Sequence, residues 1–263
     1  MRAMLRGRNR WFQVFSTISG GVLFLFLVAP IFMSIVGSAT GFPEALSDPR
    51  ITNSLYLSFY CGALATLFSL LLGIPLAYLL SRYSFKGRVI LDSLIDLPIL
   101  IPHNAAGIAL LFLFGPRGSF GGFFSNLGIS FMDTVAGIVL AMSFVSAPYM
   151  VRSAQDAFES ISHDMEDAAS NLGASPSRVF MDISLPLAAR GIVSGCMLTW
   201  ARAVSEFGAI MVLAYYPKTA PVLLFDVLMG EGLGKAMPIT GLLLITGLLI
   251  LFGFRSIREM FRN

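Results

Sequence analysis

The chain has 263 residues, of which 56% are hydrophobic and only 13% are charged. Soluble domains carry about 25% charged residues, so this composition excludes an ordinary globular enzyme and favours an integral membrane domain. The net charge of +3 is small and the basic residues are scattered, so we expect no nucleic-acid partner.

Six segments are long and apolar enough, or nearly so, to cross a bilayer, which takes about 20 residues per helix. In chain order they are residues 12–36, 54–80, 89–114, 134–151, 187–214 and 237–255. The third is interrupted by Asp92, Asp96, Pro98 and Pro102, so we expect it to lie against protein rather than lipid. We predict an all-α membrane protein with six transmembrane helices, forming a single domain over residues 1–263.

The distribution of Lys and Arg predicts the orientation of these spans. With the N-terminus inside, four basic residues lie outside: Arg50, Arg117, Lys218 and Lys235. Thirteen of the 18 lie inside: Arg2, Arg6, Arg8, Arg10, Arg82, Lys86, Arg88, Arg152, Arg178, Arg190, Arg255, Arg258 and Arg262. Both termini are therefore predicted to be cytoplasmic. We expect Asp92 and Asp96 to contact Arg82, Lys86 or Arg88, which are close to them in the sequence.

The longest polar stretch, residues 152–186, follows the fourth span and is predicted to be cytoplasmic. An amphipathic run over residues 153–172 predicts a first short helix, and Gly173 is suited to end it because glycine accepts a left-handed backbone. Ser175 as N-cap and Pro176 at the first helical position predict a second helix. Its apolar face is expected to contain Val179, Phe180 and Ile183, and Pro186 is expected to end it and to open the fifth membrane span.

Three small residues, Ala168, Ala169 and Gly173, lie on neighbouring turns of this loop. Side chains of this size allow another backbone to come close, which is typical of a surface that fits a partner's groove. A packed turn within the chain itself would use the same residues, so spacing alone leaves both interpretations open.

The loop resembles the signature of the permease subunits of ATP-binding-cassette importers. That signature is Glu-Ala-Ala, three residues, Gly, nine residues, Ile-x-Leu-Pro, and every spacing matches here from Asp167 to Pro186. The acidic position departs from it, because Asp167 replaces the usual Glu, and Glu166 is an alternative acid. The resemblance implies a type I importer permease fold whose cytoplasmic coupling helix docks on an ATPase. The residues it assigns to coupling are Glu166, Asp167, Ala168, Ala169, Gly173, Ile183, Leu185 and Pro186.

Two further blocks resemble the molybdate/tungstate branch of these permeases, with sulfate/thiosulfate permeases as a related group. One block runs over residues 96–110, and the other contains Arg202-Ala-Val-Ser-Glu-Phe-Gly208 and continues to residue 223. The resemblance covers nearly the whole chain from about residue 45. It implies a prokaryotic cell-membrane importer that works as a dimer of permease subunits, expected to be a homodimer. An extracytoplasmic binding protein would deliver the oxyanion.

Ionisable residues within membrane segments are costly and usually face protein or water. Arg202 and Glu206 are four residues apart on the fifth segment and are expected to share a helical face. They either pair with each other for structural reasons or line the pathway together with Ser205. An arginine fork suits an oxyanion, whereas Glu206 repels one, so any anion site there is expected to be weak. His103 is a further pathway candidate, with a satisfied buried histidine as the alternative.

No ATPase motif is present. The closest stretch, Gly230–Ala236, has Met229 where a P-loop needs Gly and Ala236 where it needs Ser or Thr. The chain is thus expected to be non-catalytic and to hold no cofactor of its own, with ATP and Mg²⁺ bound by a partner ATPase. No group of residues has metal-ligand spacing. A secondary transporter driven by an ion gradient and a membrane scaffold are the alternatives from other classes.

Overall fold

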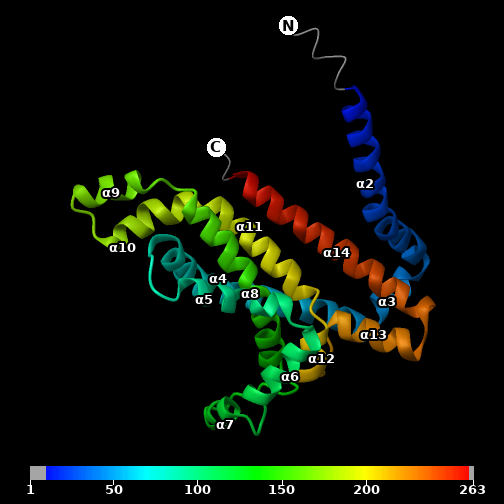
Figure 1. Ribbon diagram of the computed structural model, residues 1–263. Coiled ribbons are helices and arrows are strands. Elements are labelled where there is room, and N and C mark those ends of the chain that lie inside the picture. Colours follow the sequence, from blue (N-terminus) through cyan, green and yellow to red (C-terminus); the bar gives the residue numbers. More distant parts are fainter. Residues whose placement is uncertain (1–9, 261–263) are drawn as a thin grey trace.

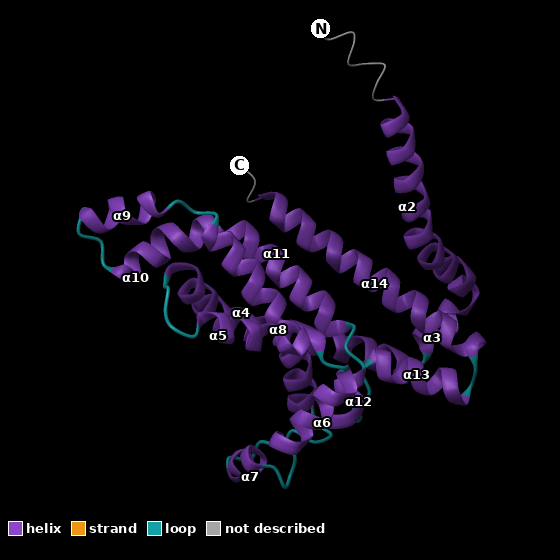
Figure 2. Ribbon diagram, in the orientation of Figure 1, coloured by secondary structure: helices purple, strands orange, loops and turns teal. Residues whose placement is uncertain are grey.

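The computed structural model describes residues 10–260, without the side chains of Ile257, Arg258 and Met260. Four of the basic residues counted for topology, Arg2, Arg6, Arg8 and Arg262, lie outside this range. Within residues 10–260 the chain folds into helices joined by turns and loops, and no strand is present (Figure 2). The predicted all-α class is confirmed.

Five long stretches of helix are apolar enough to cross a membrane. They contain α2 (Arg10–Ser38), α4 (Pro49–Arg82), α8 (Val135–Glu159), α11 (Leu185–Val204) and α14 (Leu233–Met260). A sixth span is obtained if the bent pair of α5 (Arg88–Leu100) and α6 (His103–Phe114) is counted as one. The chain is therefore a multi-pass membrane protein.

The third span is broken where its sequence predicts irregularity. The helices α5 and α6 meet at an angle of 113°. Ile101 and Pro102 between them are extended, with ψ of 144° and 134°. This is the conformation that a proline imposes on the residue before it. The break turns the start of α6 toward the end of α11.

The core of the bundle forms where α8 packs against α4 and α11 (Figure 1). Small residues allow these helices to approach closely, as is common in membrane bundles. A Cβ on Gly62 of α4 would lie only 2.6 Å from the Val204 side chain of α11, and one on Gly191 would overlap Ala157 of α8. These contacts fix α11, which carries Arg202, against the other two helices.

The segments between spans contain short helices. Residues 37–53 lie between the first and second predicted spans, and they form the 3₁₀ turn η1 (Ala39–Gly41), α3 (Phe42–Ser47) and the start of α4. The segment between the third and fourth predicted spans contains α7 (Ser119–Asn126), and the segment between the fifth and sixth contains the apolar helix α13 (Ala220–Gly230). The helix α13 is anchored to α4 by a hydrogen bond of 2.7 Å from the Ala220 backbone N–H to Ser58 Oγ.

Two predicted boundaries differ from the structure. The fourth helix does not end near residue 151 but continues to Glu159, so the predicted helix over residues 153–172 is in fact two pieces. The second piece is α9 (His163–Asn171). The predicted fifth span over residues 187–214 is interrupted at residues 205–207, and its last part is the separate helix α12 (Gly208–Leu213).

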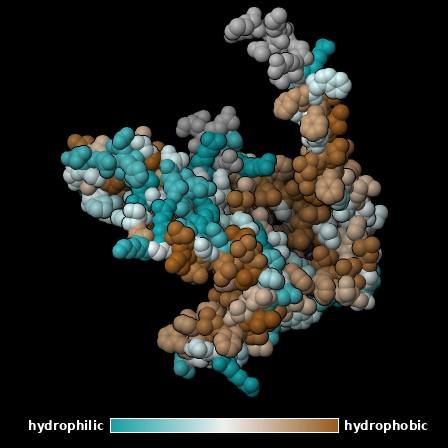
Figure 3. Space-filling model, viewed as in Figure 1, coloured by the Kyte–Doolittle hydropathy of each residue, from teal (hydrophilic) through white to brown (hydrophobic). Residues whose placement is uncertain are grey.

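The polar part of the molecule is concentrated at one end. Figure 1 shows α9 toward the same end as the start of α2 and the end of α14, whereas α7 lies at the opposite end. In Figure 3, hydrophilic residues gather over the region of α9, and apolar residues cover much of the rest of this face. The predicted docking loop therefore lies at the polar end of the molecule.

Candidate functional site

The first candidate site is the loop that contains α9. Its N-terminus is capped by Ser162, whose hydroxyl accepts a hydrogen bond of 3.3 Å from the Asp164 N–H. At its C-terminus Gly173 has φ of +88°, and the N–H groups of Gly173 and Ala174 bond back to Ser170 O and Ala169 O at 2.9 and 3.0 Å. This is a Schellman motif, so Gly173 ends the helix as the sequence predicts.

The second half of the loop is the beginning of the fifth span. The short helix α10 (Pro176–Val179) passes through a π-helical turn, η2 (Phe180–Ser184), directly into α11. Pro186 therefore does not end a helix; it lies in the first turn of α11, where proline is tolerated. Ser175 occupies the N-cap position without a capping bond, because its hydroxyl contacts Ser177 Oγ at 3.1 Å.

The predicted apolar face of this second helix packs inward. Val179 is buried, and the ring of Phe180 meets that of Tyr78 edge-on, with centroids 4.8 Å apart. The helix that leads into the membrane is thereby packed onto α4. Ile183 and Leu185 are half-buried, while Pro186 is exposed. Part of the surface of Ile183 and Leu185 is therefore covered by the rest of the chain.

The exposed surface of α9 combines predicted and unpredicted residues. Asp167, Ala168 and Gly173 are exposed, and Ala169 is half-buried. Two apolar side chains that the motif does not contain, Met165 and Leu172, are 55% and 90% exposed. Met165 lies three residues before Ala168 and Leu172 lies four residues after it. This helical spacing is visible in the sequence and could have identified the face. The result is a small apolar ridge with the exposed Asp167 carboxylate beside it.

Glu166, the alternative acid of the motif, points the other way. Its carboxylate is buried, receives two hydrogen bonds from Arg82 and accepts a third from Ser184. Burial raises the pKa of Glu166, but the hydrogen bonds from Arg82 and Ser184 and the Arg82 charge outweigh it. The pKa therefore lies below its ordinary value, and Glu166 stays ionised and engaged inside the chain. Asp167 is the exposed acid of the pair.

The second candidate site lies where the third and fifth spans are both broken. His103 begins α6, while Arg202, Ser205 and Glu206 lie at the end of α11 and in the break after it. The structure brings all four together. Arg202 Nη2 is 2.7 Å from Glu206 Oε2 and 3.1 Å from His103 Nδ1. The predicted Arg202–Glu206 pair is present, although the helix ends between the two residues.

Glu206 is the most enclosed member of this group. Its side chain has no exposed surface, and its second oxygen accepts a hydrogen bond of 2.7 Å from the N–H of Ala209 in α12. The Arg202 side chain, by contrast, is 17% exposed, and Ser205 and His103 are exposed. Together with Pro102, Asn104, Phe207 and Gly208, these three residues line an open pocket. The pocket contains one cationic group, the Arg202 guanidinium, which is paired with the buried carboxylate of Glu206. The Ser205 hydroxyl and the His103 imidazole lie beside it.

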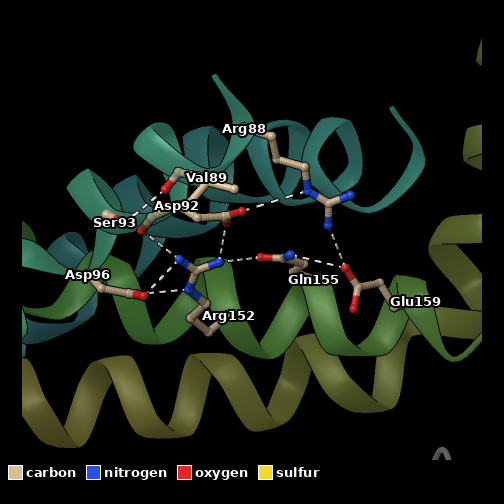
Figure 4. Close-up of polar contacts among 8 residues, drawn as sticks. All are labelled: Arg88, Val89, Asp92, Ser93, Asp96, Arg152, Gln155 and Glu159. Atoms are coloured by element: carbon tan, nitrogen blue, oxygen red, sulfur yellow. Dashed lines mark hydrogen bonds and ion pairs between the residues drawn. The ribbon is translucent and has the colours of Figure 1, made fainter. Parts of the chain in front are cut away.

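The predicted contact with Arg88 is present for Asp92, but the closest partner of both Asp92 and Asp96 is a residue that was not predicted. Arg152 of α8 binds Asp92 Oδ1 at 2.6 Å and both oxygens of Asp96 at 2.8 and 2.9 Å (Figure 4). Of the three predicted partners, Arg88 contacts Asp92 at 3.7 Å, and neither Arg82 nor Lys86 is paired with either acid among the described contacts. Sequence proximity was misleading here, because the break after α5 folds this helix back along α8.

Comparison with known proteins places the chain among transport permeases. Residues 69–259 match the family described as binding-protein-dependent transport system inner membrane component. A molybdate/tungstate transport system permease protein of Pyrococcus furiosus is 38% identical over 93% of this chain and 94% of its own. Its counterpart in Thermococcus kodakarensis is 41% identical over 81% of each chain. A sulfate transport system permease protein of Escherichia coli is 30% identical over 83% of this chain and 80% of its own.

The fold is also found in solved structures. A chain from a bacterial ABC transporter involved in the import of the acidic polysaccharide alginate superposes over 99% of both chains, with a TM-score of 0.77 and 16% identity. The expected type I importer permease fold is thereby confirmed. Together with the family match over residues 69–259, these findings establish that the chain belongs to the family of binding-protein-dependent transport system inner membrane components.

Proposed function

We propose that this chain is the permease subunit of an ATP-driven importer of molybdate and tungstate. The observation that carries the proposal is the 38% identity to a molybdate/tungstate permease protein over 93% of the chain. An extracytoplasmic binding protein delivers the oxyanion, and two copies of the chain enclose the pathway. The importer lies in the cell membrane of a prokaryote, with both termini of the chain in the cytoplasm.

The pocket of His103, Arg202 and Ser205 is the proposed passage for the oxyanion. A planar guanidinium and a hydroxyl both donate hydrogen bonds to tetrahedral oxyanions. Glu206 lies behind Arg202 and neutralises much of its charge, so the pocket attracts a dianion only weakly. Weak binding suits a passage, because an anion held tightly at this point would not be released to the cytoplasm.

Energy comes from separate ATPase subunits, which bind ATP and Mg²⁺. The apolar ridge of Met165 and Ala168 on α9 and Leu172 at its C-cap supports docking, because 90% exposure of a leucine at the end of a short polar helix suits a surface that a partner covers. Asp167 lies beside the ridge and is the acid available to a basic group of the ATPase. The permease itself carries out no catalysis.

Sulfate or thiosulfate is the second candidate cargo. It is supported by the 30% identity to a sulfate permease protein of Escherichia coli, which is lower than the identity to molybdate/tungstate permeases. Uptake of labelled molybdate into proteoliposomes that contain the permease, its ATPase and its binding protein tests the cargo. We expect uptake to require ATP and to be inhibited by tungstate more strongly than by sulfate. Stronger inhibition by sulfate would reassign the cargo, and uptake without the ATPase would indicate a secondary transporter.

Substitutions at Gly173 test the docking loop. A Cβ added at this position would meet no atom of the chain within 4 Å, but the backbone φ of +88° would strain a residue other than glycine by about 1 kcal/mol. Gly173→Leu adds both strain and bulk and is expected to lower ATPase retention and uptake while insertion into the membrane stays intact. Gly173→Ala adds strain alone, and Gly173→Asn adds bulk with little strain, because Asn tolerates this conformation. Uptake by Gly173→Leu at the wild-type rate would contradict a docking role.

A further inference from the structure

The docking helix α9 is attached to the rest of the chain through a carboxylate. All residues of α9 are described, and Glu166 alone among them is buried. A short surface helix is ordinarily held by apolar side chains on its inner face. Here the apolar residues Met165 and Leu172 point outward, and the inner contact is ionic.

This carboxylate joins the ends of two membrane helices. Arg82, the last residue of α4, donates from Nε to Glu166 Oε2 at 2.7 Å and from Nη2 to Oε1 at 2.9 Å. Ser184, the last residue of η2, donates to Oε1 at 2.6 Å and lies directly before α11. Arg82 is itself nearly inaccessible, with 6% of its side chain exposed.

An attachment needed only for stability would not require this arrangement. Replacing a buried ion pair by well-packed apolar residues is often neutral or stabilising, and Arg82 Nη1 is buried without a hydrogen-bond partner. The two hydrogen bonds between Arg82 and Glu166 also fix how the two side chains are oriented. A bidentate bond between guanidinium and carboxylate fixes both distance and orientation, whereas apolar surfaces can slide past each other.

The bond lies above a packed aromatic layer. Tyr78, one turn before Arg82, contacts Phe158 of α8 and Phe180 of η2 with ring centroids 5.2 and 4.8 Å apart. The Arg82 guanidinium lies over the Tyr78 ring at 5.9 Å. A displacement of α9 would therefore reach α4 through Arg82 and α11 through Ser184 at the same time. The π-helical turn η2 is a type of element frequently found at functional sites.

We propose that Glu166 is a positioning residue, and that its bonds to Arg82 and Ser184 carry the movement of the docked helix into α4 and α11. This inference rests on the proposed function, since it requires an ATPase that moves α9. It assigns the two adjacent acids different tasks: Asp167 faces the ATPase, while Glu166 transmits the movement inside the permease.

The test uses the complete transporter in proteoliposomes with the variant Glu166→Gln, which keeps the shape of the side chain and removes its charge. We expect the ATPase to remain bound, while molybdate imported per ATP hydrolysed falls on the order of tenfold, within the usual range for coupled sites. The exchange Arg82→Glu with Glu166→Arg restores part of the loss. Asp164→Asn, which removes an exposed acid from the same helix, is the matched control and stays at the wild-type ratio.

Hydrolysis by the bound ATPase is followed in parallel, because it does not depend on the cargo. We expect the wild-type permease to change the hydrolysis rate of the ATPase and Glu166→Gln to abolish this change. Absence of molybdate uptake by the wild type, with its effect on hydrolysis intact, would overturn the proposed cargo and not the inference. Should Glu166→Gln fail to assemble, Ser184→Ala serves as the milder variant with the same expectation. A wild-type import ratio and hydrolysis response in the assembled variant would overturn the inference.

Discussion

Glu166 and Asp167 are neighbours in the sequence with opposite surroundings. Successive residues of a helix point about 100° apart, so one carboxylate is directed at Arg82 while the next faces solvent. Breaking a buried ion pair by removing one partner costs about 3–5 kcal/mol, because it leaves the other charge uncompensated. Glu166→Gln is therefore expected to destabilise the protein at neutral pH far more than Asp167→Asn does.

The lowered pKa of Glu166 predicts how this difference depends on pH. A carboxyl whose folded pKa is depressed contributes stability above its ordinary value of 4.5 and loses it as the pH falls through the folded pKa. We expect the gap in unfolding temperature between wild type and Glu166→Gln to be full at neutral pH and to close below about pH 4.5. Thermal unfolding of detergent-purified protein measures this gap, and a gap that stays constant down to pH 3, well below that value, would contradict the depressed pKa.

Residue-scale partners were the least predictable feature of the molecule. The motif predicts that an acid near residue 166 matters, but it does not tell which acid faces inward. That choice depends on Arg82, which is 84 residues away in the sequence. Asp92 and Asp96 illustrate the same limit, since their short hydrogen bonds are with Arg152, about 60 residues later, and of the nearby basic residues named above only Arg88 contacts one of them, Asp92, at 3.7 Å. Local spacing carries no information on such tertiary pairs.

At the scale of elements, α5 is held to the bundle mainly by polar contacts. None of its residues is buried, and Val89, Ile90, Leu94 and Leu100 are all exposed. Arg152 of α8 binds two carboxylates of α5 and, in addition, the backbone oxygen of Asp92 at 2.7 Å (Figure 4). The apolar contact of α5 with the bundle is made by Leu91 and Ile95, which are partly buried.

The substitution Arg152→Gln is expected to loosen α5. It leaves Asp96 without its Arg152 counter-charge and Asp92 with only the more distant Arg88, and because these groups are partly exposed, we expect a loss of about 1–2 kcal/mol rather than the larger loss of a fully buried pair. Protease cleavage in the loop over residues 83–87 and the thermal unfolding midpoint measure the effect. The matched control is Arg88→Gln, which loses only the outer contacts to Asp92 and Glu159. Equal effects of the two variants would contradict a central role for Arg152.

Element positions were more predictable than element ends. Six apolar segments in the sequence correspond to five long helical stretches and one bent pair, because the length of an apolar run is a local property. Proline and acidic residues in the third segment indicated its break. The direction of the break and the interruption after Val204 could not be predicted. The interruption after Val204 depends on Glu206, whose carboxylate is buried and accepts a hydrogen bond from the N–H of Ala209. This contact is set by packing and not by the helical pattern of the sequence.

At the scale of the whole molecule, a single chain leaves its proposed pathway open on one side. The pocket wall at Asn104 continues along α6 through Ile108 and Phe112, four residues apart each time. Ile108 is 60% exposed and Phe112 is 82% exposed. An apolar stripe that begins in a polar pocket suits a surface covered by protein. In the proposed homodimer this surface meets its symmetry mate and closes the pathway.

The proposed homodimer predicts a specific cross-link. In a chain whose two cysteines, Cys61 and Cys196, are replaced by alanine, Phe112→Cys is expected to form a disulfide between two copies under mild oxidation. A symmetric interface brings equivalent residues near its axis close together. Leu172→Cys, at a position that is even more exposed but lies at the C-cap of α9, is expected to stay monomeric on a non-reducing gel, because each docking helix faces its own ATPase. A cross-link at Leu172 with none at Phe112 would show that the copies meet through a different face, and the pocket of Arg202 would then lie outside any passage between them.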